Sequence, residues 1–159
     1  MATITVGVAT TASGSADGGY TRLNKSNPCT GTGVISTMKF YFPYSSGSGV
    51  KCGTFSGSGT SWSVRDYENI GNVSYGSVQT FTGLNCGASL NDLIGMYTPE
   101  ESGEYAAANS GSGILYLSGD TFSGTNTYSS YGPFSLYIYG EGEGEVPASG
   151  VEYNGVTIS

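Results

Sequence analysis

The sequence predicts an all-β protein, an antiparallel two-sheet sandwich of the jelly-roll kind, and three observations support this. The chain of 159 residues is rich in Gly (27) and Tyr (13), and only 11% of its residues are charged. Tyr and Thr favour strands, whereas Gly and Ser favour the turns between them. Apolar residues alternate in twos along many segments, and no sustained helical repeat occurs. This length suits one domain with a core of its own.

The expected strands follow one another at short intervals. Residues 1–8 alternate apolar and small polar side chains, and a loop is expected at 9–19. The clearest strand covers 33–42 and ends at Pro43. We expect one face of it to carry Val34, Met38, Phe40 and Phe42, and the other Ile35, Thr37, Lys39 and Tyr41. The remaining strands are expected at 20–23, 50–55, 62–67, 72–75, 78–84, 93–97, 113–117 and 134–139.

One turn predicts a hairpin, and a second turn follows it. The Ser-Gly run at 45–49 predicts that strand 33–42 pairs with strand 50–55 through a longer loop. The second turn, at 57–60, precedes the strand at 62–67.

The chain is expected to divide into a sandwich at 1–140 and a tail at 141–159. The tail begins with an acidic Gly-Glu run, interpreted as a linker, and ends in a hairpin around Asn154-Gly155. A hairpin this short is not stable alone. We therefore expect it to add to a neighbouring sheet, with Tyr153, Val156 and Ile158 as apolar contacts.

Charge and cysteine content narrow the classes of partner. The formal net charge is −7, so nucleic acid is not an expected partner. No segment has the length and apolar character needed for membrane insertion, and the start lacks the features of a secretory signal. Three cysteines are an odd number, and we expect Cys52 and Cys86 to be unpaired, buried residues on strands.

Catalysis is not expected, because the chain contains no histidine to activate a nucleophile or act as a general base. A Ser-Lys dyad would need Lys39 or Lys51, which fit solvent-facing strand positions better. Carboxylate pairs of the glycosidase kind would come from Asp66 with Glu68, or from Glu100, Glu101 and Glu104. These five carboxylates are more simply explained as solvated acids.

No cofactor is expected, although a structural calcium ion is a candidate. Loop acids and backbone carbonyls suit calcium, and the candidate ligands are Asp17, Asp92 and Asp120. Their spacing matches no calcium-loop motif, and ordinary turn-forming aspartates are the alternative.

Aromatic residues are the candidate contact groups. Tyr137 and Tyr139 alternate with apolar residues at 134–139, which predicts an outward-facing pair for contact with a subunit or a sugar. Trp62 follows a Ser-Gly turn, where an exposed ring could stack on a saccharide. The alternative is that Trp62 closes one end of the core and the tyrosines cover a second sheet.

Two stretches resemble known proteins. Residues 50–97, with Gly53-Thr54-Phe55, Tyr67-Glu68-Asn69-Ile70-Gly71-Asn72-Val73, Gln79-Thr80-Phe81-Thr82-Gly83-Leu84 and Asp92-Leu93-Ile94-Gly95-Met96-Tyr97, resemble a β-sandwich module of uncharacterised phage and environmental structural proteins. The tail Tyr153-Asn154-Gly155-Val156-Thr157-Ile158-Ser159 is similar to Asn-Gly-Val hairpin units of phage structural proteins.

The resemblance implies a non-enzymatic virion part, a capsid decoration or fibre-like surface protein. We then expect a homo-oligomer that contacts other virion proteins, made in the host cytoplasm and displayed on the virion surface. The alternatives are a carbohydrate-binding β-sandwich of a secreted or cell-surface protein, whose partner is a glycan, and a subunit of an extracellular filament.

Overall fold

The computed structural model describes residues 2–9, 15–16, 18–99, 105–108, 111–145, 152–153 and 156–157. Within these ranges all regular structure is β, as predicted, and no helix long and apolar enough to cross a membrane occurs. In chain order the strands are β1 (Thr3–Val8), β2 (Ser15–Ala16), β3 (Tyr20–Asn24), β4 (Gly33–Tyr41), β5 (Gly47–Ser58), β6 (Ser61–Val73), β7 (Val78–Phe81), β8 (Cys86–Ala88), β9 (Leu93–Thr98), β10 (Tyr105–Ala108), β11 (Ile114–Ser118), β12 (Thr125–Thr127), β13 (Ser129–Tyr131), β14 (Ser135–Leu136), β15 (Ile138–Gly144), β16 (Glu152–Tyr153) and β17 (Val156–Thr157).

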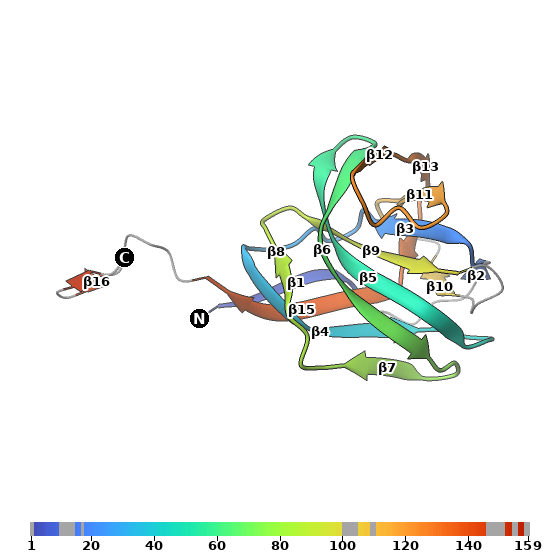
Figure 1. Cartoon of the computed structure of the whole chain (residues 1–159), viewed down its shortest axis with the longest axis horizontal. Helices are drawn as coiled ribbons and strands as arrows, with labels where there is room; N and C mark the ends of the chain where they lie inside the picture. The colour runs from blue at the N-terminus through green and yellow to red at the C-terminus, as the bar shows by residue number, and fades with distance from the viewer. Residues whose placement is uncertain are drawn as a thin grey trace.

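Two antiparallel sheets form the sandwich (Figure 1). The five-stranded sheet has the order β1-β15-β4-β7, with β8 also paired to β4. The seven-stranded sheet has the order β12-β6-β5-β9-β3-β11-β13. The smaller sheets are β14-β10-β2 and β16-β17.

The strand order is that of a jelly roll. Eight strands, β1, β3, β4, β5, β6, β7, β9 and β15, form two four-stranded layers ordered β1-β15-β4-β7 and β3-β9-β5-β6. Successive strands cross from one layer to the other, except that β5 and β6 are joined as a hairpin within one layer. This is the double Greek-key arrangement found in capsid proteins, lectins and cupins. Strands β10 to β14 are an insertion between the last two strands of that order.

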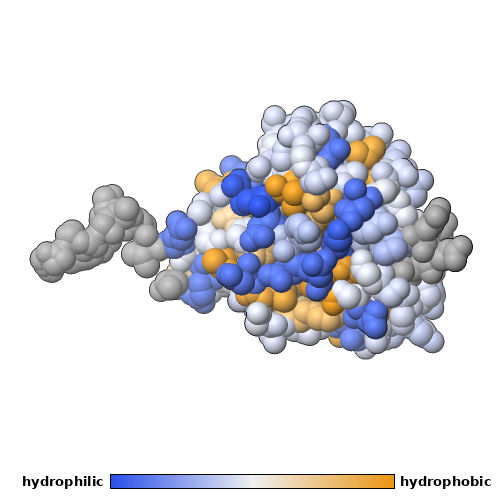
Figure 2. Space-filling model, in the orientation of Figure 1, coloured by the Kyte–Doolittle hydropathy of each residue, from blue (hydrophilic) through white to orange (hydrophobic). Residues whose placement is uncertain are grey.

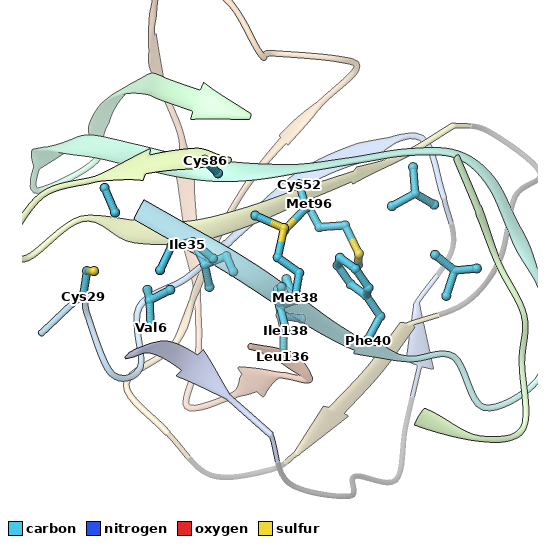
Figure 3. Packing of buried hydrophobic residues seen from close by; sticks show 14 of the residues in the cluster. Val6, Cys29, Ile35, Met38, Phe40, Cys52, Cys86, Met96, Leu136 and Ile138 are labelled. Atoms are coloured by element: carbon cyan, nitrogen blue, oxygen red, sulfur yellow. The ribbon is translucent and has the colours of Figure 1, made fainter. Parts of the chain in front are cut away.

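The main core lies between the two sheets. Met38, Phe40 and Ile138 of the five-stranded sheet face Cys52 and Met96 of the other layer (Figure 3). All five are at most 2% exposed. Burying side chains of this size supplies most of the free energy of folding.

A second core lies on the opposite face of the seven-stranded sheet. The insertion between β11 and β13 folds back over this face, so that the Phe122 ring meets Phe55 and Tyr67 with centroids 5.1 and 5.3 Å apart. Thr21 holds the insertion, because its hydroxyl donates to the Gly119 carbonyl and accepts from the Thr121 amide. Strands β3, β5 and β9 are therefore covered on both faces.

The predicted hairpin of strand 33–42 with strand 50–55 is wrong. β4 pairs with β15, β7 and β8, whereas β5 pairs with β6 and β9 in the other sheet. In a jelly roll the chain crosses between layers at this connection, and the local turn signal cannot distinguish a crossing from a hairpin. The β5–β6 hairpin formed at the second turn.

The faces of β4 were predicted correctly only in its second half. A register shift at Glu141/Gly142 opposite Thr37 and Ile35 leaves Ser36 as an extra residue, which is a β-bulge. The bulge reverses the alternation, so Ile35 is fully buried and Val34 is 39% exposed.

The predicted linker begins too early. Glu141 to Gly144 continue β15, the central strand between β1 and β4. The Gly-Glu alternation is a strand pattern in which the glycines are buried and the glutamates are not. A Cβ on Gly142 would also lie 1.8 Å from the carbonyl oxygen of Val34 on the paired strand β4. Strands β16 and β17 do pair with each other, as the tail hairpin predicts. Asn154, Gly155 and residues 146–151 lie outside the described residues.

Two truncations should separate β15 from the tail. A chain ending at Gly140 keeps the pairs of Ile138 to Gly140 but loses those that Glu141 to Gly144 make with β1 or β4, and we expect it to melt well below the full chain. A chain ending at Glu145 keeps every pair of β15 and should retain the full-length melting temperature, measured by circular dichroism. Equal melting of both truncations would contradict the central position of β15.

Candidate functional site

Trp62 lies in β6 as part of the second core and does not offer an open ring. It is 8% exposed, and its Nε1 donates to the Gly59 carbonyl at 2.9 Å. The expectation of an exposed stacking ring is therefore wrong: the turn after β5 is tight, and the insertion between β11 and β13 covers this face of the sheet.

The tyrosine pair at 137 and 139 is only partly accessible. Both side chains lie opposite Ile138 on the alternating backbone, as predicted, but Tyr137 is 7% exposed and packs against Tyr41 with ring centroids 5.9 Å apart. The Tyr139 hydroxyl donates to the Glu141 carboxylate at 3.1 Å. Tyr137 is thus unsuited to an outward contact. The side chains of Tyr153 and Val156, and the whole of Ile158, lie outside the described residues.

The calcium candidates that the structure describes are engaged by cationic side chains. Asp92 is 2% exposed and accepts from Arg65 Nε at 2.5 Å, from Arg65 Nη2 at 3.1 Å and from the Ser89 amide at 2.9 Å. Asp120 accepts from Lys51 Nζ at 2.5 Å and from the Phe122 amide at 3.0 Å. Asp17 lies outside the described residues, and the described residues hold no cluster of three metal-ligating side chains.

Both aspartates instead form ion pairs that join separate parts of the fold. Lys51 and Asp120 join β5 to the insertion that covers it, while Arg65 and Asp92 join β6 to the turn before β9. Partial burial tends to raise the pKa of Asp120, but the bonds from Lys51 and the Phe122 amide outweigh this and hold its pKa below the ordinary value.

Asp66 and Glu68 form a clasp between the two sheets rather than a catalytic pair. β8 belongs to the five-stranded sheet, yet Asp66 Oδ2 accepts from its Gly87 amide at 2.8 Å and Glu68 Oε2 accepts from the Asn85 amide at 2.8 Å. The Thr54 hydroxyl donates to the Gly87 carbonyl at 2.6 Å. These bonds replace a backbone ladder at this edge, which we call the β8 clasp. Glu100, Glu101 and Glu104 lie outside the described residues.

The three cysteines are free and buried, as expected for Cys52 and Cys86. Burial raises the pKa of each thiol, most strongly for Cys52. For Cys86, burial and then the nearby charge of Asp66 raise the pKa from 9.0 to about 12. A protonated buried thiol is a poor nucleophile.

A row of aromatic rings crosses the end of the seven-stranded sheet, and we call it the tyrosine row: Tyr20 on β3, Tyr116 on β11, Tyr131 on β13 and the adjoining Phe134. Tyr131 is exposed and the other three are half-buried. The centroids of Tyr20 and Tyr116 are 6.2 Å apart, those of Tyr116 and Tyr131 6.4 Å, and Tyr131 stacks on Phe134 at 4.7 Å and 12°. Tyr131 is 57% exposed. Strands β3, β11 and β13 lie together at the upper right of Figure 1.

Sequence reasoning missed this row because its members come from three separate segments. The register places them together: Tyr116 lies opposite Arg22 on β3 and Ser129 on β13, so these side chains share a face. The only local signal was a tyrosine in each of three short strands.

A second exposed group lies at the edge of the five-stranded sheet. Tyr44, Tyr75 and Val78 are 62%, 57% and 45% exposed, and the Gly76 amide donates to the Phe42 carbonyl, which joins their segments. We call this the β7 edge. The view in Figure 2 shows a hydrophilic band across the middle of the molecule with hydrophobic areas around it. Comparison with protein-family models, curated proteins and solved structures finds no match for the chain.

The β8 clasp should contribute measurably to stability. Asp66→Ala leaves the Gly87 amide without its acceptor and should lower the free energy of unfolding by about 1–3 kcal/mol. Asn69→Ala, on an exposed position of the same strand, should change it by less than about 0.5 kcal/mol. Urea denaturation followed by the fluorescence of buried Trp62 measures both, and equal effects would contradict the clasp.

The buried thiols should make the protein sensitive to alkali. An unfolded thiol ionises near pH 9.0, whereas folded Cys86 stays protonated to about 12. The unfolded state then binds fewer protons, so stability falls as pH rises above about 9. Cys86→Ala should reduce this fall in a pH series of denaturation midpoints.

Native thiols should not react with a thiol reagent at neutral pH, and rapid labelling of the folded chain would contradict their burial.

Proposed function

We propose that the protein is a non-enzymatic structural protein that acts by assembling with copies of itself, as a capsid decoration or fibre-like protein on a virion surface. The observation that carries the proposal is the jelly-roll strand order, an architecture that capsid proteins use repeatedly. Such a sandwich offers rigid faces and short edges for packing against neighbours.

The candidate reactive carboxylates and the thiols, where the structure describes them, are bonded or buried within the fold, which supports a non-enzymatic role. In the described part of the chain, Asp66, Glu68, Asp92 and Asp120 all accept bonds that hold strands or loops together. The thiols are buried with raised pKa values. The absence of histidine from the sequence removes the commonest general base.

The β7 edge is the surface that best suits assembly. The outer side of β1 is already bonded by residues 27–30, through Gly7 to Asn27 and Thr30 to Thr5. Strands β12 and β13 have three residues each, whereas β7 has four and stands beside exposed Tyr75 and Val78. An open edge of this kind pairs readily with a strand from another chain.

The C-terminal tail is the segment proposed to add to such an edge. Residues 146–159 follow the last core strand and carry Val146, Val151, Tyr153, Val156 and Ile158. A flexible chain reaches about 5–6 Å times the square root of its residue number, so a tail of this length can span to a neighbouring copy. Addition of its hairpin to the β7 edge would link sandwiches through backbone hydrogen bonds.

Light scattering after size-exclusion chromatography tests the proposal. The full chain should give a mass that is a multiple of 16.3 kDa. Val78→Asp places a charge at the β7 edge and should shift the mass to that of the monomer, as should the chain ending at Glu145. Leu90→Asp, at a 58% exposed position outside the edge, is the matched control and should leave assembly intact.

A full chain that stays monomeric at every concentration tested would contradict the proposal. If neither Val78→Asp nor removal of 146–159 affects assembly, the protein still self-assembles, but not by addition of the tail to the β7 edge.

A further inference from the structure

The tyrosine row differs in chemistry from the β7 edge. The residues that share its face are Tyr20, Arg22, Asn24, Ile114, Tyr116, Ser118, Ser129 and Tyr131, of which Arg22, Asn24 and Ile114 are buried. No exposed aliphatic side chain and no carboxylate occurs among these described residues. The accessible part of this face, among the described residues, therefore consists of phenol rings and small hydroxyls.

The tyrosine hydroxyls are available to a ligand. The described residues provide no hydrogen-bond partner for the hydroxyls of Tyr20, Tyr116 and Tyr131, whereas Tyr128 and Tyr139 each bond a neighbouring side chain. A tyrosine side chain offers an apolar ring and a polar tip together. Rings and hydroxyls placed side by side match a sugar, which has apolar C–H faces and a rim of hydroxyl groups.

The row is also held in a fixed geometry. Tyr131 stacks on Phe134, Tyr116 stands edge-on to both Tyr20 and Tyr131, and the Arg22 guanidinium lies 4.7 Å from the centroid of the Tyr20 ring. Three of the four rings are on or next to paired strands of the seven-stranded sheet. Contact groups that are already ordered lose little side-chain entropy when a ligand binds.

We propose that the tyrosine row is a saccharide-binding surface that takes a neutral polysaccharide chain along Tyr20, Tyr116 and Tyr131. The formal charge of −7 disfavours a polyanionic ligand, and the row itself carries no described acid that would select a cationic one. A second protein subunit is the occupant that the test below separates from a sugar, because tyrosine is also enriched at protein interfaces. The inference is independent of self-assembly.

Affinity electrophoresis in gels that contain a soluble neutral polysaccharide tests the inference, with glucan, mannan, galactan and xylan as separate probes. At least one probe should retard the full chain, and isothermal titration with an oligosaccharide of the same sugar should then give the affinity. Tyr131→Ala should lower that affinity about tenfold, the scale of one lost aromatic contact. Tyr116→Phe keeps the ring, removes the hydroxyl and should weaken binding less.

Tyr44→Ala is the matched control, because Tyr44 is 62% exposed and lies outside the row. It should leave binding unchanged, and thermal melts should show that all three variants are folded. The proposal is overturned if none of the four probes retards the chain, or if Tyr44→Ala weakens binding as much as Tyr131→Ala. A Tyr131→Ala variant that binds normally but loses its oligomeric mass would identify the row as a subunit interface instead, and would also overturn it.

Discussion

The position of β15 between β1 and β4 is the constraint on which the rest of the sandwich depends. This strand pairs with both, and its inward positions after Ile138 are glycines, at Gly140, Gly142 and Gly144. A Cβ on Gly140 would lie 3.0 Å from Ile35 and 3.3 Å from Ile94, which belong to different sheets. Side chains from both layers therefore pack over Gly140, where β15 has no side chain. The bulge in β4 opposite Gly142 decides that Ile35 is buried while Val34 is exposed.

Polar groups close the structure where backbone pairing does not reach. β8 is paired on one side only with β4, and its other side is satisfied by Asp66, Glu68 and Thr54 from the opposite sheet. The insertion over the second core is fastened by Lys51 with Asp120 and by the Thr21 hydroxyl. An unpaired amide at such a site would cost free energy, so these side chains are committed to the fold. This is the physical reason that the acids most suggestive of catalysis are structural.

The aromatic groups proposed for contacts lie in two places with different chemistry. The β7 edge combines an open strand with Tyr44, Tyr75 and Val78, which suits protein contact. The tyrosine row combines rings with unpartnered hydroxyls, which suits a sugar. A surface protein that assembles through one region and binds a glycan through another would use both, and the two activities are separable because the regions share no residue.

The sequence by itself determined the fold class, most strand positions, the turn that joins β5 to β6 and the burial of Cys52 and Cys86, because these follow from alternation, turn residues and side-chain polarity. It also contained β15, but the Gly-Glu alternation has no apolar side chains and was interpreted as a linker. Only the tertiary structure decided which strands cross between sheets, that Trp62 and Tyr137 are covered, and that Asp66 reaches Gly87. The tyrosine row likewise exists only in the folded chain. Each of these features depends on contacts between residues far apart in the sequence. Local periodicity predicts which face of a strand a side chain lies on. It does not predict which other segments of the chain cover that face.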